Sequence, residues 1–227
     1  MLVSHAHRLV YMKTRKTAGT SVEVYLEHAC LGSAEPPLRS QREEREDPAL
    51  IVGRRSSDIS GARWWNHIPA ALVRERLGPL WDAYLKVCCV RNPFDKLVSA
   101  FWMQQPDAAR AALAEASFEQ VRQAFRAWAL GGGDLMGDRE VVAIDGAFCL
   151  DEVIRYETLA RDLERVCDLA GLPWRPELLK AYKSANRRRP EPFAAYYDAA
   201  TIALVRDAFA FELGQFGYPD RPDANTA

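Results

Sequence analysis

The segment from Lys13 to Ser21 reads Lys-Thr-Arg-Lys-Thr-Ala-Gly-Thr-Ser and has the composition of a phosphate-binding loop. It follows an apolar run at 9–12 and leads into an apolar helical pattern that begins after Ser21. Small and hydroxyl residues at the start of a helix present several backbone N–H groups to an anion, with the positive end of the helix dipole behind them. Lys16 adds a full positive charge. These residue types in this order predict a phosphate cradle.

A second junction between a strand and a helix also carries a basic residue. The apolar run at 84–90 is the clearest strand of the chain, and it ends at Arg91. Asn92 is a suitable helix cap, Pro93 suits the first helical position, and Ser99 lies on the helix that follows. Ligands of parallel α/β sheets bind at the carboxyl ends of the strands. Two anion-binding corners at these ends suit a ligand with a phosphate at each end.

An ordinary P-loop ATPase fits these residues less well. Its loop runs Gly-x-x-x-x-Gly-Lys-Ser/Thr, whereas Lys16 precedes Gly19, the single glycine of this loop. A nucleotide kinase also needs an acidic residue at a strand end to hold magnesium. The strand at 84–90 is followed by Arg91 instead.

Composition and charge limit the partners of the chain. Its 227 residues include 30 basic and 31 acidic residues, so no overall field attracts nucleic acid or an anionic membrane. The five cysteines show no metal-ligand spacing, and Cys88 and Cys89 are expected to be buried thiols of a reducing compartment. No apolar segment reaches the roughly 20 residues that span a bilayer. We therefore expect a soluble, cytoplasmic protein without nucleic-acid partners, a membrane span or a bound metal.

The order of the predicted elements is that of an α/β fold with a central parallel sheet flanked by helices. The expected strands lie at 9–12, 84–90 and 153–156, with a possible short strand at 50–52. The expected helices begin at 21, 69, 93, 117 and 159, and a last helix covers 198–213. On the first helix, Glu23 and Glu27 are predicted to face solvent.

The chain is expected to form one domain over residues 1–227. Residues 31–62 contain prolines and a charged run and are interpreted as a long loop excursion or a substrate lid, and 219–227 as a tail.

Both phosphate-binding segments resemble those of one family. Residues 16–21, Lys-Thr-Ala-Gly-Thr-Ser, resemble the 5′-phosphosulfate loop of sulfotransferases that use 3′-phosphoadenosine 5′-phosphosulfate (PAPS), a group that includes carbohydrate and heparan sulfate sulfotransferases. Residues 90–101 resemble the segment whose arginine and serine hold the 3′-phosphate. The two motifs lie about 75 residues apart, and 151–159 and 216–218 also resemble family stretches.

The resemblance implies a P-loop-like sulfotransferase fold and an enzyme that transfers a sulfuryl group from PAPS to a hydroxyl acceptor, a carbohydrate or small metabolite. It implies in-line displacement without a metal, with Lys16 neutralising the departing oxygen. Many members have proline where this chain has Arg15, and the role of that arginine is left open. The implied donor-binding residues are Arg15, Lys16, Thr17, Ala18, Gly19, Thr20, Ser21, Arg91 and Ser99.

His67 is the candidate general base. It lies at a boundary between a loop and a helix, beside Trp64 and Trp65, and an unperturbed histidine pKa near 6.5 suits this role at neutral pH. Alternatively, His67 caps its helix or packs on tryptophan. Glu157 and Asp58 are weaker substitutes as the base.

Basic and aromatic residues outside these motifs have two interpretations each. One interpretation of the basic cluster is contact with the nucleotide or an anionic acceptor, and the other is a solvated surface. The cluster comprises Lys180, Lys183, Arg187, Arg188 and Arg189. Four tryptophans are candidates either for stacking on adenine or a sugar or for packing in the core: Trp64, Trp65, Trp102 and Trp128. Helical spacing favours core packing for Trp102 and Trp128.

Two other function classes remain open besides the sulfotransferase. One is a nucleotide-dependent transferase such as a kinase with a divergent loop. The other is a non-catalytic relative that binds nucleotide without turnover. The sequence motifs do not identify the acceptor or the oligomeric state.

Overall fold

The computed structural model describes residues 1–32, 42–135, 137–182 and 187–223. The chain forms two compact units, each made of two separate segments. We call residues 1–90 and 138–182 the sheet unit, and residues 91–137 and 183–227 the helical unit. The expectation of a single domain over 1–227 stays a prediction.

A six-stranded sheet is the centre of the sheet unit. In spatial order its strands are β3 (Arg45–Glu46), β4 (Leu50–Val52), β1 (Leu2–Ser4), β2 (Leu9–Met12), β5 (Leu85–Val90) and β8 (Glu152–Arg155). The strands β2, β5 and β8 pair in parallel, with Met12 opposite Cys88 and Val90 opposite Arg155. This confirms the predicted α/β fold with a central parallel sheet. The carboxyl ends of β2 and β5, which lead into the two motifs, therefore lie on neighbouring strands.

Antiparallel strands extend this sheet on one side. The strand β1 pairs with both β2 and β4, and β3 pairs with β4. The predicted strand at 50–52 is confirmed as β4. The loop excursion predicted over 31–62 also contains a strand that was not predicted, at 45–46, while 33–41 lie outside the described residues.

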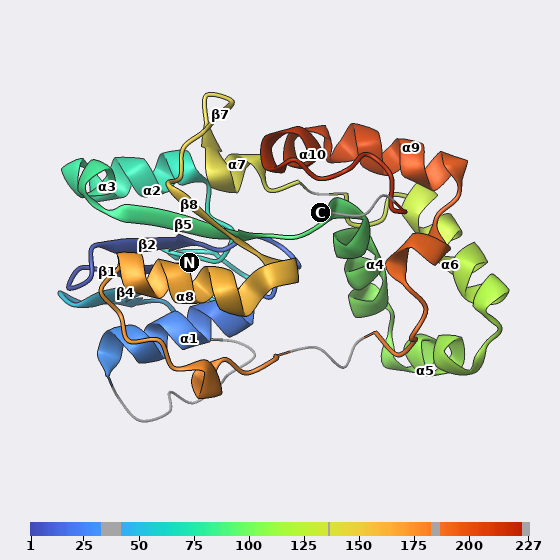
Figure 1. Ribbon diagram of the computed structural model, residues 1–227, viewed down its shortest axis with the longest axis horizontal. Helices are drawn as coiled ribbons and strands as arrows, with labels where there is room; N and C mark the ends of the chain where they lie inside the picture. Colours follow the sequence, from blue (N-terminus) through green and yellow to red (C-terminus); the bar gives the residue numbers. More distant parts are fainter. Residues whose placement is uncertain (33–41, 136, 183–186, 224–227) are drawn as a thin grey trace. The chain divides into compact units, whose positions relative to one another are not determined.

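Helices cover both faces of the sheet (Figure 1). Helices α1 (Gly19–Leu31) and α8 (Leu159–Leu169) lie on one face, and α2 (Ala70–Leu77), α3 (Pro79–Ala83) and the short α7 (Arg139–Val142) on the other. The short pair β6 (Ala143–Ile144) and β7 (Ala147–Phe148) follows α7, and the turns η1 (Tyr156–Thr158) and η2 (Pro176–Leu178) flank α8. The buried positions of α8 are spaced three to four residues apart and face the sheet, as in an amphipathic helix, whereas α1 is buried on more than one face.

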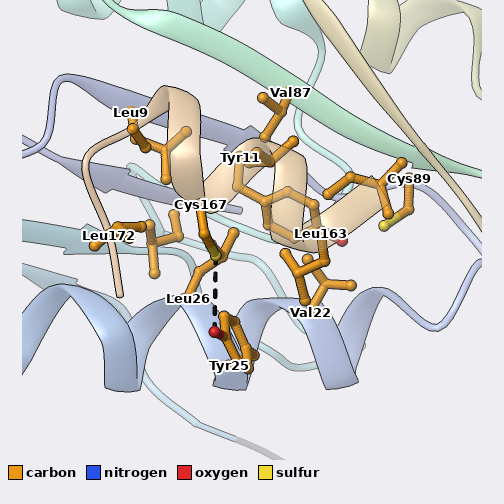
Figure 2. Close-up of a cluster of buried hydrophobic side chains, with 14 of the residues drawn as sticks. Leu9, Tyr11, Val22, Tyr25, Leu26, Val87, Cys89, Leu163, Cys167 and Leu172 are labelled. Atoms are coloured by element: carbon orange, nitrogen blue, oxygen red, sulfur yellow. Dashed lines mark hydrogen bonds between the residues drawn. The ribbon is translucent and has the colours of Figure 1, made fainter. Parts of the chain in front are cut away.

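The core between these two helices and the sheet is closely packed. Tyr11 and Val87 from the strands meet Val22 from α1 and Leu163 from α8, all fully buried (Figure 2). The Tyr25 hydroxyl of α1 lies 3.7 Å from the Cys167 sulfur of α8. This core fixes the first turns of α1 against β2, and so fixes the loop between them.

The helical unit is built around aromatic side chains. Its elements are α4 (Pro93–Gln104), α5 (Asp107–Glu115), α6 (Phe118–Leu130), η4 (Phe193–Tyr196), α9 (Ala199–Ala208) and α10 (Ala210–Phe216). Trp102 is fully buried and its indole N–H donates to the Tyr196 hydroxyl at 3.2 Å, which confirms the expected core role. Trp128 is only partly buried; its indole N–H donates to Gln104.

The helix boundaries follow local signals in most cases. Asn92 accepts from the N–H of Phe94 at 2.9 Å, and Ser117 and Gln120 form the expected capping box. The single helix predicted over 198–213 is wrong, because the helix is interrupted at Phe209 and continues as α10. Among the described residues, no helix is long and apolar enough to cross a membrane.

Candidate active site

The loop between β2 and α1 has an unusual backbone. Lys16 and Ala18 both lie in the left-handed region, with φ of 60° and 59°. Such conformations are unfavourable for residues with a Cβ and persist where the surroundings enforce them, often at binding sites. Ala18 is the N-cap of α1 and has no polar side chain to bond the first turn. The helix itself uses neither the N–H of Gly19 nor that of Thr20, so this end of α1 can bind an anion.

Close packing inside the loop favours glycine at position 19. A Cβ added there would lie 3.0 Å from the Lys13 Cγ and 3.2 Å from the Thr14 carbonyl oxygen. Both distances are shorter than ordinary contacts between such atoms. The sequence suggested that glycine is present at this position because it allows a phosphate to approach the backbone. The structure adds a second reason for glycine, the close packing of the loop, which is independent of any ligand.

Three hydroxyl groups in and beside the loop make contacts that hold the loop in place. The Thr14 hydroxyl contacts the Cys89 carbonyl oxygen of β5 and lies 2.8 Å from the Thr17 hydroxyl. The Ser21 hydroxyl accepts from the N–H of Tyr182 at 3.2 Å. Thr17 and Ser21 are both buried, while Thr20 is partly exposed. The side chains of Thr17 and Ser21 therefore stabilise the loop.

Arg15 ties the loop to a distant part of the sheet unit. Its backbone N–H donates to Asp138 Oδ1 at 3.0 Å, and its guanidinium lies 3.4 Å from the same oxygen. Asp138 is buried and precedes α7. No sequence motif indicates Asp138, because this contact joins residues 123 positions apart.

His67 is held next to the same loop. Its Nδ1 lies 2.8 Å from the Lys13 carbonyl oxygen. A carbonyl oxygen only accepts hydrogen bonds, so Nδ1 carries the proton and Nε2 has the lone pair. Burial and the positive charge of Arg15 together lower the pKa of His67 to about 4, although Asp138 opposes this shift. At neutral pH, His67 is therefore a neutral imidazole whose Nε2 can accept a proton.

The tryptophans before His67 are occupied by protein contacts. Trp64 is buried, and its indole N–H donates to Glu46 at 2.8 Å. The Arg76 guanidinium lies 5.2 Å from the centre of the Trp65 ring. These contacts favour a structural role for both rings, and they fix the segment from which His67 extends.

The predicted exposure of Glu23 and Glu27 is wrong, since both are buried. Glu23 is completely enclosed: it contacts the cations Lys13 at 2.7 Å, Arg42 at 3.1 Å and Arg55, and it lies 2.9 Å from the Met1 amino group, whose pKa burial lowers to about 5. Although burial opposes ionisation, these cations hold the pKa of Glu23 well below its usual range. Burial lowers the pKa of Lys13 to about 8, against the attraction of Glu23. Lys13 belongs to the loop, so this cluster braces the loop against α1.

Arg91 in the helical unit is oriented by a carboxylate. Its Nε and Nη2 atoms lie 2.8 and 2.7 Å from Asp95 Oδ2, one helical turn along α4. The other oxygen of Asp95 lies 3.1 Å from Nη1 of Arg187. Ser99 lies a further turn along α4 and is partly exposed.

The remaining candidate residues are placed as follows. Arg189 contacts Glu191 and the carbonyl oxygens of Ala114 and Ala116, which is a structural role. Lys180 and Arg188 are exposed, and Lys183 lies outside the described residues. Glu157 in η1 and Asp58 in a loop are both exposed, and backbone hydrogen bonding lowers the pKa of Asp58, which makes it a weaker base.

Comparison with known proteins gives one match. The family model described as "Sulfotransferase family" matches residues 1–219. No curated protein and no solved structure matches the chain. In the part of the chain that the structure describes, no group of three His, Cys, Asp or Glu side chains is placed to hold a metal ion.

Proposed function

Because the chain belongs to the sulfotransferase family, we propose that it transfers a sulfuryl group from PAPS to a hydroxyl group of a carbohydrate or small metabolite. The observation that carries this proposal is the loop after β2. It combines two left-handed residues, a lysine and the N-terminus of α1. The neighbouring parallel strand β5 leads directly to Arg91.

The proposed donor contacts follow from the chemistry of these groups. The backbone N–H groups of residues 18–20 and the Lys16 amine bind the 5′-phosphosulfate. Arg91 and Ser99 bind the 3′-phosphate, because a guanidinium donates two parallel hydrogen bonds to phosphate oxygens. Arg15 pairs with Asp138, so its contribution is to hold the loop.

The proposed reaction is an in-line displacement at sulfur. The acceptor oxygen forms a bond to sulfur while the bond from sulfur to the bridging phosphate oxygen breaks. The acceptor proton passes to Nε2 of His67, and Lys16 stabilises the negative charge that grows on the bridging oxygen. By analogy with phosphoryl transfer, positioning and electrostatic stabilisation supply most of the catalysis.

Nucleotide binding tests the proposed donor. Titration calorimetry compares 3′,5′-adenosine bisphosphate with ATP and magnesium. We expect the bisphosphate to bind at least about tenfold more tightly, a difference of about 1.4 kcal/mol. A preference for ATP would support the kinase alternative and contradict the proposal. Labelled sulfuryl donor and a panel of glycans and hydroxylated metabolites then separate an enzyme from a non-catalytic relative.

Replacing His67 with alanine is expected to lower kcat by about 10²-fold, the lower end of general-base contributions, because a base of low pKa is a weak one. The KM for PAPS is expected to stay within about twofold, since the proposed donor contacts remain. In the unmodified protein, kcat/KM is expected to fall only as pH decreases toward about 4, because the lowered pKa keeps His67 deprotonated above that value. A pH-rate profile from 4 to 9 measures this.

His7→Ala is the control for this variant, since His7 is a partly exposed histidine at the turn between β1 and β2. It is expected to keep the original rate. If kcat/KM instead falls as pH decreases through about 6.5, in both His67→Ala and the unmodified protein, another group is the base.

A further inference from the structure

One carboxylate in the helical unit joins two arginines. Asp95 contacts Arg91 through Oδ2, at 2.7 and 2.8 Å, and Arg187 through Oδ1, at 3.1 Å. All three side chains are largely shielded, with exposures of 13% for Asp95, 9% for Arg91 and 26% for Arg187. The two guanidinium groups therefore lie on either side of a single negative charge.

The position of Asp95 is set by the fold. It lies in the first turn of α4, which Asn92 caps and which begins with Pro93. Arg187 is also fixed from its other side, because its guanidinium lies 5.6 Å from the centre of the Tyr196 ring and contacts the Glu191 carbonyl oxygen. The Asp95 carboxylate thus connects a rigid helix end to a second segment of the helical unit.

Two guanidinium groups this close would repel each other without the carboxylate between them. The side chain of arginine also has many rotamers, and Asp95 selects one for Arg91. A carboxylate near a phosphate site has a direct unfavourable effect, because two negative charges repel. The presence of Asp95 beside Arg91 is explained if the binding energy gained by orienting the Arg91 guanidinium exceeds this repulsion.

We propose that Asp95 is a positioning residue for 3′-phosphate recognition: it holds Arg91 in its binding orientation and keeps Arg187 beside it. This inference rests on the proposed function, because it takes Arg91 as the 3′-phosphate ligand. It assigns to Asp95 the selectivity for nucleotides that carry a 3′-phosphate. Orientation of Arg91 by Asp95 strengthens phosphate binding, whereas repulsion between Asp95 and the phosphate weakens it. Substitution of Asp95 shows which effect is larger.

The test compares 3′,5′-adenosine bisphosphate with 5′-AMP by calorimetry, for the unmodified protein and for Asp95→Ala and Asp95→Asn. We expect Asp95→Ala to weaken bisphosphate binding by about 10- to 100-fold, the value of a charged hydrogen-bonding interaction. Binding of 5′-AMP is expected to change by less than about twofold, because that nucleotide lacks the 3′-phosphate. Asp95→Asn keeps the shape and one acceptor oxygen, so a smaller loss is expected.

Asp107→Asn is the matched control. Asp107 is also an acidic residue in the first turn of a helix, and it pairs with Arg110 at 2.8 Å, but it is 95% exposed. The Asp107→Asn substitution removes the same type of charge from the N-terminus of a helix. No change is expected in the affinity for the bisphosphate or for 5′-AMP.

The possible outcomes separate this proposal from the proposed function. If the unmodified protein binds the bisphosphate no better than 5′-AMP, both are overturned. If it prefers the bisphosphate and the Asp95 variants keep or increase that preference, Asp95 is a competing counter-ion and only the positioning role is overturned. Asp95→Asn gives this answer even where Asp95→Ala does not fold.

Discussion

Replacing Lys16 with alanine is expected to lower kcat for sulfuryl transfer by about 10³-fold, the upper range for loss of one electrostatic contact to a transition state. The charge that Lys16 is proposed to stabilise develops mainly as the bond from sulfur to oxygen breaks, so the KM for PAPS is expected to change less than kcat. Alanine keeps a Cβ in the left-handed conformation at residue 16, where φ is 60°. The variant therefore removes the charge without relaxing the loop. Steady-state rates with labelled PAPS measure the effect.

Arg8→Ala is the matched control for Lys16→Ala. Arg8 is likewise a basic residue of the sheet unit with a positive φ, 48°, but it is exposed in the turn between β1 and β2. Its removal is expected to leave kcat unchanged, whereas Lys16→Arg is expected to retain part of the activity. If Lys16→Ala keeps its rate within about threefold of the original, this lysine does not stabilise the leaving group.

Replacing Glu23 with glutamine is expected to reduce the free energy of unfolding by about 3–5 kcal/mol, the usual cost of removing one partner of a buried ion pair. Lys13, Arg42 and Arg55 would then lie together without their shared carboxylate. Urea denaturation of both proteins at pH 7 gives the difference. Lys13 belongs to the loop, so a weaker affinity for 3′,5′-adenosine bisphosphate is expected as well.

The pH dependence of this difference is a second readout. The pKa of Lys13 is about 8, so its attraction to Glu23 is present below that pH and is lost as pH rises through it. The destabilisation by Glu23→Gln is therefore expected to be smaller at pH 9 than at pH 7. Glu43→Gln is the control, since Glu43 is 80% exposed in its ion pair with Arg54 and such pairs contribute about 0–1 kcal/mol. An equal loss of unfolding free energy in Glu23→Gln and Glu43→Gln would contradict a stabilising role for the buried cluster around Glu23.

Elements with strong local signals were predictable from the sequence. The apolar run at 9–12 is a strand with the predicted bounds, and Asn92 and Pro93 begin α4 as predicted. These features depend on residues within a few positions of one another. The two-residue edge strand β3 and the interior strand β1 were not predicted, because their formation depends on pairing with other segments of the chain.

Solvent exposure was less predictable than secondary structure. Glu23 follows the helical spacing of a solvent-facing residue, yet it is fully buried, because basic groups from other parts of the chain surround it. Helical periodicity describes which residues share a face. It does not describe what covers that face.

The sequence by itself determined the family and the α/β order, and it predicts a phosphate-binding loop, because short motifs and local periodicity carry this information. Only the tertiary structure decided which groups hold that loop and what proton state its neighbours have. The contacts of Arg15 with Asp138 and of His67 with the Lys13 carbonyl oxygen join residues far apart in the chain. Such contacts, and the burial that sets the pKa of His67, arise from packing, which no local segment encodes.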